Sequence, residues 1–313
     1  MITRDRVGDL VVALGHLEAL RERPRIVVVD NGSSDGTAAA VRRRFPGVEL
    51  VELAGNRGAA ARTIGVERVA SPYVAFADDD SWWAPGALRL AADLLDEHPR
   101  LGLVNAHILV GPDERPDPVC VEMARSPLPA ADRQPGHPLL SFVACGAVVR
   151  REAYLAAGGF HGRLSVGGEE EILGADLLAA GWQMSYVPEI VVHHHASATR
   201  DPAARRATQV RNALWTTWLR RPLRPALRRT AGLLRGLPRE RASLRGLGGA
   251  LLGARWLLRE RTVSPPRVEA ARRLLEAHPN GAPAPSDGRD RGLLCAHVPH
   301  QQKDQDARGR PGA

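Results

Sequence analysis

The sequence predicts an α/β protein in which a mostly parallel sheet carries helices on both faces. Three observations lead to this prediction. Short apolar runs, rich in valine and isoleucine, alternate along the chain with longer segments of helical character. The first clear run, at residues 26–29, is apolar throughout, as in strands that are buried on both faces. Turn residues separate runs from helices, and alternation at this spacing is typical of parallel sheets.

The elements nearest the N-terminus are the clearest. Residues 26–29 form a β-branched run that ends in Asp30 and predicts a buried strand. The turn chemistry after Asp30 leads into a helix at about 37–45. An alternating strand at 48–53 and a helix at about 59–70 follow.

The middle of the chain continues this alternation. Residues 73–77 read as a strand, and a helix runs from Pro85 to about Glu97 because proline is tolerated in a first turn. Another strand is expected at 101–110. The Pro-rich and polar residues 111–138 predict a long surface loop.

Residues up to about 199 complete the sheet. The expected elements are a core segment at 142–149, helices at 151–157 and 169–180, and short strands at 184–187 and 190–192. The last two are short strand candidates on either side of Pro188.

Charge and composition together divide the chain into three parts. The net charge of the 313 residues is +8. Residues 200–278 hold 19 arginines and five acids, a net charge of +14, so the remainder sums to −6. We therefore predict a globular domain at 1–199, an Arg-rich helical extension at 200–278, and a tail at 279–313 whose Pro, Gly, Asp and Arg content favours disorder.

Composition also excludes some classes of protein. The three cysteines show no close pairing, which argues against a disulfide framework or a zinc site and favours a reducing compartment. No secretory signal opens the sequence. No run of 18 apolar residues occurs, so no membrane span is expected.

Three consecutive aspartates, Asp78, Asp79 and Asp80, end the apolar run at 73–77. Acids at the carboxyl end of a buried strand lie in the crevice where open α/β sheets bind ligands. Adjacent carboxylates repel one another, so such a cluster needs a cation or hydrogen bonds. Hard oxygen ligands of this kind suit Mg²⁺ or Mn²⁺. The cluster therefore predicts either a cation site that could hold a diphosphate or an acidic turn that caps the next helix.

Five segments occur in an order and spacing that one protein family shares. They are Asp30-Asn31-Gly32-Ser33-Ser34-Asp35-Gly36-Thr37, Asn56-Arg57-Gly58 with Arg62, Asp78-Asp79-Asp80, Gly158-Gly159-Phe160 with Glu169-Glu170, and Val187-Pro188-Glu189 with His193. By these motifs, residues 1 to about 200 resemble the family 2 glycosyltransferases. The resemblance implies a Rossmann-like GT-A fold and inverting transfer of a sugar from a nucleotide-diphosphate donor.

The resemblance also implies roles for the matching residues. Asp30 corresponds to the acid that holds the base or ribose, and Arg62 to an arginine of the nucleotide pocket. Asp80 corresponds to the metal-binding acid of the D-x-D motif, and a metal there stabilises the leaving nucleotide. The implied nucleotide-sugar-binding residues are Thr3, Asp30, Asn56, Arg62, Asp78 and Asp79, and the implied ligands of Mn²⁺ or Mg²⁺ are Asp78, Asp80 and His193.

The catalytic base is implied by an acidic stretch. Relatives carry G-E-D-x-D-L, and here the stretch is Gly168-Glu169-Glu170-Glu171-Ile172-Leu173. Glu170 takes the place of the usual aspartate, and Glu171 is the alternative base, since proton abstraction needs a carboxylate within hydrogen-bond reach. The competing interpretation is an acid-rich helix N-terminus, which the helix macrodipole favours.

The beginning of the chain departs from the family pattern. Relatives begin with an apolar strand before a T-x-N-R-like turn. Thr3-Arg4-Asp5-Arg6 resembles that turn, with only Met1 and Ile2 before it. We therefore expect a truncated first strand, whose loss would leave core backbone groups unpaired. The hypotheses are a true start further upstream or an inactive form.

The Arg-rich extension allows two interpretations. Leucines and tryptophans interleaved with arginines fit amphipathic helices on an anionic membrane surface. They also fit a helical appendage that packs on the catalytic domain with its arginines in solvent. No nucleic-acid reader motif occurs, so no specific nucleic-acid partner is expected. The expected location is cytoplasmic, with peripheral binding to the inner face of the plasma membrane as a further expectation.

The leading interpretation is a metal-dependent inverting glycosyltransferase. It would move a hexose or deoxyhexose from a nucleotide-diphosphate sugar to a saccharide, lipid-linked or other hydroxyl acceptor, in the synthesis of cell-wall or cell-surface polysaccharide, glycolipid or a related glycoconjugate. The rival is a catalytically inactive module that binds sugar nucleotides. A dinucleotide-binding oxidoreductase is disfavoured because no G-x-G-x-x-G follows the first strand.

Overall fold

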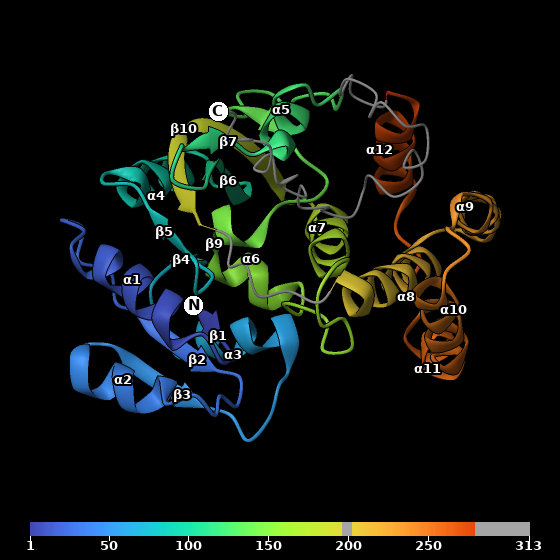
Figure 1. Ribbon diagram of the computed structural model, residues 1–313. Helices are drawn as coiled ribbons and strands as arrows, with labels where there is room; N and C mark the ends of the chain where they lie inside the picture. Colours follow the sequence, from blue (N-terminus) through green and yellow to red (C-terminus); the bar gives the residue numbers. More distant parts are fainter. Residues whose placement is uncertain (196–201, 279–313) are drawn as a thin grey trace, which may run out of the picture.

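A sheet core flanked by helices and a separate group of helices make up the protein (Figure 1). The computed structural model describes residues 1–195 and 202–278. The tail predicted to be disordered at 279–313 lies outside the described residues. The predicted α/β class is confirmed, and the sheet is mixed.

The first sheet is parallel and contains three strands in the order β1-β2-β3. Its strands are β1 (Ile2–Thr3), β2 (Val27–Asp30) and β3 (Glu49–Glu52). Helices α1 (Val7–Glu18), α2 (Thr37–Arg44) and α3 (Ala61–Glu67), the last preceded by a 3₁₀ turn at Gly58–Ala60, pack around it. The expected short first strand is thus present as two residues, and they pair with the end of β2.

The second sheet has the strand order β4-β9-β6-β10-β5. These strands are β4 (Tyr73–Ala75), β9 (Ala147–Arg150), β6 (Leu101–Val110), β10 (Gln183–His194) and β5 (Ser81–Trp83), with β7 (Arg115–Pro116) beside β6 and β8 (His137–Pro138) beside β10. β6 and β10 run parallel, whereas β9 is antiparallel to both of its neighbours. A bridge between Ile2 and Asp78 joins the two sheets, so β1 lies between β2 and the acids that follow β4.

Helices and a buried apolar cluster complete this part of the molecule. The helices are α4 (Ala87–Glu97), α5 (Pro118–Ala124), α6 (Arg151–Ala156) and α7 (Glu169–Ala179), with a 3₁₀ turn at Ala144–Gly146. The largest core cluster joins β6, β9 and β10 to α4 and α6 through fully buried side chains such as Leu103, Leu95 and Tyr154. Burial of this apolar surface is the main force that holds the sheet against its helices.

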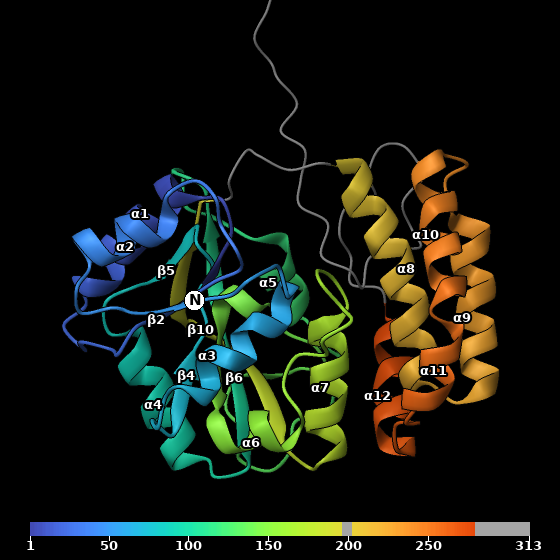
Figure 2. The same ribbon diagram turned by 90° about the horizontal axis from the view of Figure 1, so that it is seen from below.

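The Arg-rich region folds into five helices that lie beside the sheet core (Figure 2). They are α8 (Pro202–Arg220), α9 (Leu223–Gly236), α10 (Arg241–Leu252), α11 (Ala254–Glu260) and α12 (Pro266–Ala277). Leu164 and Ile172 from the α7 region share one buried cluster with Leu214, Trp215 and Leu219 of α8. The helices therefore pack on the sheet core, as one of the two interpretations of this region expected.

Two expectations are corrected. Residues 111–138 are not only loop, because they contain β7, β8 and α5, which Asp117 caps by accepting from the Val119 amide at 2.9 Å. The strands expected at 184–187 and 190–192 are one strand, β10, because an irregularity between Val187 and Val191 absorbs the proline without ending the pairing to β6. Helix α1 and strand β5 were not expected from the sequence.

No helix in the two described ranges is both long enough and apolar enough to cross a membrane.

Candidate functional site

The three aspartates form a tight turn between β4 and β5. The Ser81 amide donates to the Asp78 carbonyl at 3.2 Å, and the Asp78 amide donates to Ser81 Oγ at 2.8 Å. The side chains of Asp79 and Asp80 are almost fully buried, whereas that of Asp78 is one-third exposed. The turn thus fixes three carboxyl groups at the junction of the two sheets.

A threonine of β1 and an arginine just before α1 contact two of these carboxylates. Thr3 Oγ1 donates to Asp79 Oδ2 at 3.0 Å. Arg6 Nη1 lies 3.3 Å from both Asp79 Oδ1 and Asp80 Oδ2. Burial nevertheless raises the pKa of Asp79 to about 6, with the neighbouring aspartates adding to the effect. Asp79 therefore takes up a proton at a higher pH than an ordinary aspartate does.

Arg62, on α3, links the aspartates to the acidic stretch of α7. Its side chain is buried, forms an ion pair with Asp78, and lies over the ring of Phe160 at 5.6 Å from the centroid. Attraction to Asp78, Glu170 and Glu169 raises the pKa of Arg62 in spite of its burial. Its Nε atom has no hydrogen-bond partner among the described residues. Arg62 is thus a permanent buried cation whose buried Nε–H is unpaired among the described residues, and it interacts electrostatically with three acids.

Glu169 and Glu170 begin α7 next to this arginine. Two glycines with positive φ, Gly167 and Gly168, turn the chain into the helix. Burial, followed by repulsion from Glu170, raises the pKa of Glu169 to about 8. Burial also raises the pKa of Glu170, and a backbone hydrogen bond at Ala144 opposes that rise. Glu169 is therefore largely protonated at neutral pH. The raised pKa of Glu170 makes its carboxylate a stronger proton acceptor than that of an ordinary glutamate.

Glu171 lies elsewhere. Its Oε1 atom is 3.9 Å from Arg272 Nε on α12. Successive residues of a helix point about 100° apart, so the side chain is turned from its neighbour's direction toward the helical region. Of the two candidate bases, Glu170 is the one that interacts electrostatically with Arg62 and Asp78.

Of the histidines at the end of β10, the one beside the aspartates is His194. Its Nε2 atom lies 3.3 Å from Asp80 Oδ1. His193, the histidine named from the sequence, lies instead with Nδ1 at 2.8 Å from Glu114 Oε1 and with its ring stacked near Trp82. Adjacent residues of a strand point to opposite faces, so only one of the two can face the acidic turn.

The side chains at the aspartate turn include potential ligands for a divalent cation. Within residues 1–195 and 202–278, no three His, Cys, Asp or Glu side chains are grouped as a metal site. Asp80 and His194 nevertheless present a carboxylate oxygen and a ring nitrogen side by side. Mg²⁺ sites typically use one or two carboxylates, with substrate phosphates and waters as the remaining ligands. These residues therefore fit a cation that is held jointly with a diphosphate.

Asp30 and Asn56 lie on the other side of β1 from the aspartate turn. Thr3 pairs with Asp30 in register, and Asp30 Oδ1 accepts from the Ser33 amide at 2.9 Å. Asn56 Oδ1 accepts from the Gly58 amide at 2.7 Å. Asn56 also lines an open cavity of about 460 Å³, as does Phe160. The structure thus gathers Thr3, Asp30 and the three aspartates around β1.

Three residues of this site were not predicted from the sequence. Arg6 was expected only as part of a turn, and His194 was given no role. Asn212, on α8, donates through Nδ2 to the carbonyls of Val166 and Gly167 at 3.1 and 2.6 Å. No sequence signal identifies Asn212, because its partners are backbone atoms 45 or more positions away.

Tryptophans near the site are engaged in packing. Trp82 stacks on His16 with ring centroids 4.2 Å apart. Trp83 is buried and donates through Nε1 to the Phe76 carbonyl at 3.0 Å. These contacts account for both side chains without a sugar.

Comparison with known sequences gives a family and a relative. The family model described as glycosyl transferase family 2 matches residues 5–156. An N-acetylglucosaminyl-diphospho-decaprenol L-rhamnosyltransferase of Mycobacterium tuberculosis is 32% identical, over 70% of this chain and 85% of the relative.

Solved structures share the fold. A mannosyltransferase of Pyrobaculum calidifontis, PcManGT, in complex with GDP-Man and Mn²⁺, superposes with a TM-score of 0.52 at 20% identity, over 90% of this chain and 75% of that one. S. aureus TarS 1-349 gives a TM-score of 0.56 at 17% identity, over 86% and 81% of the two chains. At these identities the likeness establishes the GT-A fold.

Proposed function

The chain belongs to glycosyl transferase family 2, and on that premise we propose that it is an inverting, metal-assisted transferase that moves a sugar from a nucleotide diphosphate to a lipid-linked saccharide. One observation carries the proposal. Buried Arg62 interacts electrostatically with Asp78 on one side and with Glu169 and Glu170 on the other. The groups proposed for donor binding and for proton abstraction thus form one charged cluster.

The donor is proposed to be a nucleotide-activated deoxyhexose. The M. tuberculosis relative is named for L-rhamnose transfer, and 32% identity over 85% of its length supports the same sugar class here. Asp30, at the end of β2, is proposed to accept from the imide N–H of a uracil or thymine base. Asn56 and the buried Nε–H of Arg62, which has no partner among the described residues, are proposed to contact the nucleotide.

Mn²⁺ or Mg²⁺ is proposed to bind with the diphosphate, held by Asp80 and His194 with support from Asp78. PcManGT is described in complex with Mn²⁺, and carboxylates suit either ion. When bound, such a cation supplies positive charge that stabilises the leaving diphosphate. Asp79 accepts a hydrogen bond from Thr3 and forms an ion pair with Arg6. We propose that it holds the aspartate turn in place and that the turn contacts the nucleotide sugar.

Glu170 is proposed to be the base. An acceptor hydroxyl gives its proton to the Glu170 carboxylate, and its oxygen forms a bond to the anomeric carbon. The bond from that carbon to the diphosphate oxygen breaks on the opposite face, so the configuration inverts and the nucleoside diphosphate leaves. A raised pKa makes the carboxylate a stronger base for this step.

The acceptor is proposed to be a saccharide on a lipid carrier, because the relative is named for a diphospho-decaprenol acceptor. The product would serve in cell-wall or cell-surface glycoconjugate synthesis. The enzyme would then work at the cytoplasmic face of the membrane that holds the lipid. Cys120 and Cys145 are free and buried, as suits a reducing compartment.

The test is a transfer assay with purified protein and a panel of nucleotide-activated sugars, with Mn²⁺, Mg²⁺ or a chelator. We expect one deoxyhexose donor to give a product of inverted configuration and a nucleoside diphosphate in equal amounts, with no reaction in chelator. Binding of the nucleotide without any release of diphosphate, with donor and acceptor of the right class present, would instead identify an inactive binding module.

A further inference from the structure

Exposed leucines are concentrated on three consecutive helices of the Arg-rich region. In residues 1–195 the exposed large apolar side chains are scattered one to an element. By contrast, α9, α10 and α11 expose Leu223, Leu227, Leu234, Leu244, Leu251, Leu252 and Leu258. Leu252 is 89% exposed and Leu251 77%. A group of exposed apolar side chains of this kind marks a binding surface.

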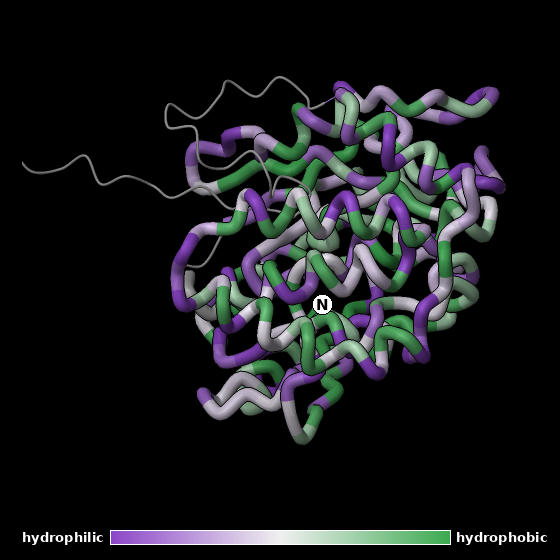
Figure 3. The backbone as a smooth tube through the Cα atoms, turned by 90° about the vertical axis from the view of Figure 1, so that its right-hand side faces the viewer, coloured by the Kyte–Doolittle hydropathy of each residue, from purple (hydrophilic) through white to green (hydrophobic). Residues whose placement is uncertain are grey.

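Most of these leucines are followed directly by an arginine. The pairs are Leu223-Arg224, Leu227-Arg228, Leu234-Arg235, Leu244-Arg245 and Leu258-Arg259, and every member of each pair is exposed. On α9 the spacings of four and seven residues place the three leucines on one stripe, with the three arginines on the next stripe around the helix. Figure 3 shows the side of the molecule on which the helices lie, with hydrophobic and hydrophilic segments alternating along them.

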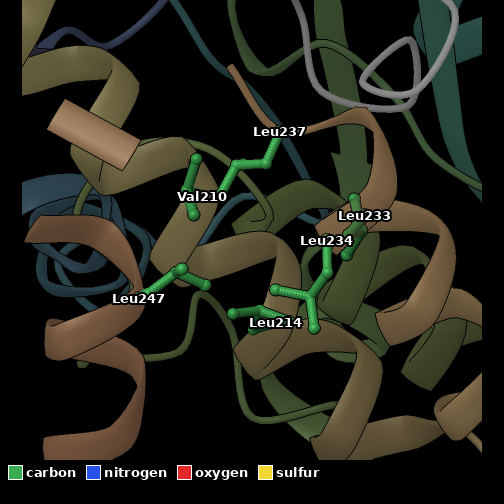
Figure 4. Close-up of a pocket in the computed structure, with 6 residues that line it drawn as sticks. All are labelled: Val210, Leu214, Leu233, Leu234, Leu237 and Leu247. Carbon is green, nitrogen blue, oxygen red and sulfur yellow. The ribbon is translucent and has the colours of Figure 1, made fainter. Parts of the chain in front are cut away.

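The apolar stripes of α9 and α10 meet in one groove. Leu233, Leu234 and Leu237 from α9 and its end, Leu247 from α10, and Val210 and Leu214 from α8 converge there (Figure 4). Leu244 and Leu251 lie one turn before and one turn after Leu247, on the same side of α10. The exposed Leu234 of α9 thus lies beside the side of α10 along which Leu244 and Leu251 are exposed.

This surface is strongly basic. Residues 223–260 contain nine arginines and two glutamates, a net charge of +7. Both glutamates are occupied, Glu240 by Arg206 and Glu260 by Arg163 and His161. Among the described residues, no ion pair is formed by Arg224, Arg228 or Arg235. The charge of the α9 arginines is therefore available to an external anion.

We propose that the surface formed by these leucines and arginines of α9–α11 docks on an anionic lipid bilayer. The leucines would enter the acyl boundary and the arginines would contact lipid phosphates, which is the pattern of interfacial helices. A second copy of the chain is a poor occupant, because two surfaces of +7 repel each other. The inference rests on the proposed function only in that a lipid-linked acceptor gives such docking a use.

The docking surface is rigidly connected to the candidate base. α10 packs along α8, with Trp215 Nε1 donating to the Ala250 carbonyl at 3.1 Å. α8 in turn holds the loop before α7 through Asn212. Docking through α9–α11 would therefore hold Glu170 in a fixed position relative to the bilayer surface.

The experiment is sedimentation of the full chain with vesicles of phosphatidylcholine, with and without phosphatidylglycerol, in the absence of donor and acceptor. The chain should bind the anionic vesicles, and binding should weaken as salt is added. The double variant Leu251→Glu/Leu252→Glu should reduce partitioning by about tenfold or more. Arg224→Gln and Arg228→Gln should each reduce it by about fivefold.

Val121→Glu is the matched control, because Val121 is a half-exposed apolar residue on α5, away from the surface. It should bind vesicles like the parent chain. The proposal is overturned if the parent chain does not bind, if the α9–α10 variants bind equally well, or if they convert a dimer to a monomer, which would indicate a second copy as occupant. Transfer to a water-soluble acceptor analogue, assayed in the same variants, distinguishes loss of docking from failure of the proposed function.

Discussion

Arg6 Nη1 lies 3.3 Å from Oδ2 of Asp80. Asp80 belongs to the acidic turn that is proposed to hold a metal ion. The same nitrogen is equally close to Asp79. Arg6 therefore neutralises the carboxylates when no other cation does so. A divalent ion that uses Asp80 must compete with this guanidinium, which makes metal affinity dependent on a residue that is not a ligand.

Replacing Arg6 should tighten metal binding. In Arg6→Gln the oxygens of Asp79 and Asp80 lose their guanidinium partner, and we expect the affinity for Mn²⁺ to rise by about tenfold, the scale of a hydrogen bond to a charged group. Isothermal titration calorimetry with and without a nucleoside diphosphate measures this. Arg4→Gln is the control, because Arg4 is half-exposed and, within the described part of the chain, its ion pair is with Asp5. Unchanged or weaker binding in Arg6→Gln would contradict the competition.

Removing the carboxylate of Glu170 should stop the chemical step. We expect Glu170→Gln to lower kcat by about 10² to 10⁴, the usual contribution of a general base, and to leave nucleotide binding almost unchanged. Glu171→Gln, which loses only a contact with Arg272, should keep most of the activity. Because burial raises the pKa of Glu170, activity of the parent chain should fall on the acid side at a pH above the ordinary value of 4.5. A larger loss of kcat in Glu171→Gln than in Glu170→Gln would assign the base to Glu171.

Much of the fold follows from the pattern of residues along the chain. The runs at 26–29 and 101–110 predict β2 and β6 because both are apolar, β-branched and bounded by turn residues. The strand β5 is not predictable in this way. It has three residues and depends on pairing with β10, from which it is more than 100 positions away in the sequence.

Prediction of the site from the sequence is limited in the same way to local features. The aspartates are visible because they end a strand, a local feature. Which histidine faces them depends on the alternation of β10 after the irregularity between Val187 and Val191, and that is a property of its pairing with β6. Arg6 and Asn212 contact segments that are distant in the sequence. Composition and motif spacing carry no information about such contacts.

Burial of Glu169 should make stability depend on pH. Its pKa is raised from 4.5 to about 8, so the folded chain binds a proton that the unfolded chain releases. The free energy of unfolding should therefore be highest below about pH 4.5 for this group and fall as the pH rises through about 8. Glu169→Gln should gain on the order of 2 kcal/mol at about pH 9 relative to the parent chain, and little at about pH 5.

Urea unfolding at the two pH values measures this difference. The control is Glu171→Gln, because the Glu171 side chain lies at the same helix end and is about one-quarter exposed. This variant should show the same pH dependence of stability as the parent chain. An equal effect of Glu169→Gln at both pH values would show that Glu169 is charged throughout, and that Arg62 dominates its surroundings.

Asn212 is predicted to position the catalytic loop from the helical region. It is buried, and its Nδ2 atom donates to two consecutive carbonyls just before Gly168. Gly168 has a φ of +91°, and a Cβ atom there would lie 2.7 Å from Thr216 on α8, so α8 is in direct contact with the turn that aims Glu169 and Glu170. Asn212→Asp keeps the shape of the side chain, removes the donor and places an acceptor against two carbonyl oxygens.

We expect Asn212→Asp to lower kcat by about tenfold to a hundredfold, since a displacement of about 1 Å at a reacting group costs this much. The KM for the donor and the affinity for its nucleotide should change by no more than about twofold, because the proposed nucleotide residues lie outside the loop that Asn212 holds. Thr230→Val, which removes the acceptor of Trp218 Nε1 elsewhere in the helical region, is the control for general destabilisation. If both variants lower stability alike and neither changes kcat, Asn212 only holds the two parts of the molecule together. A loss of kcat in Asn212→Asp alone would mean that the helical region sets the position of the base.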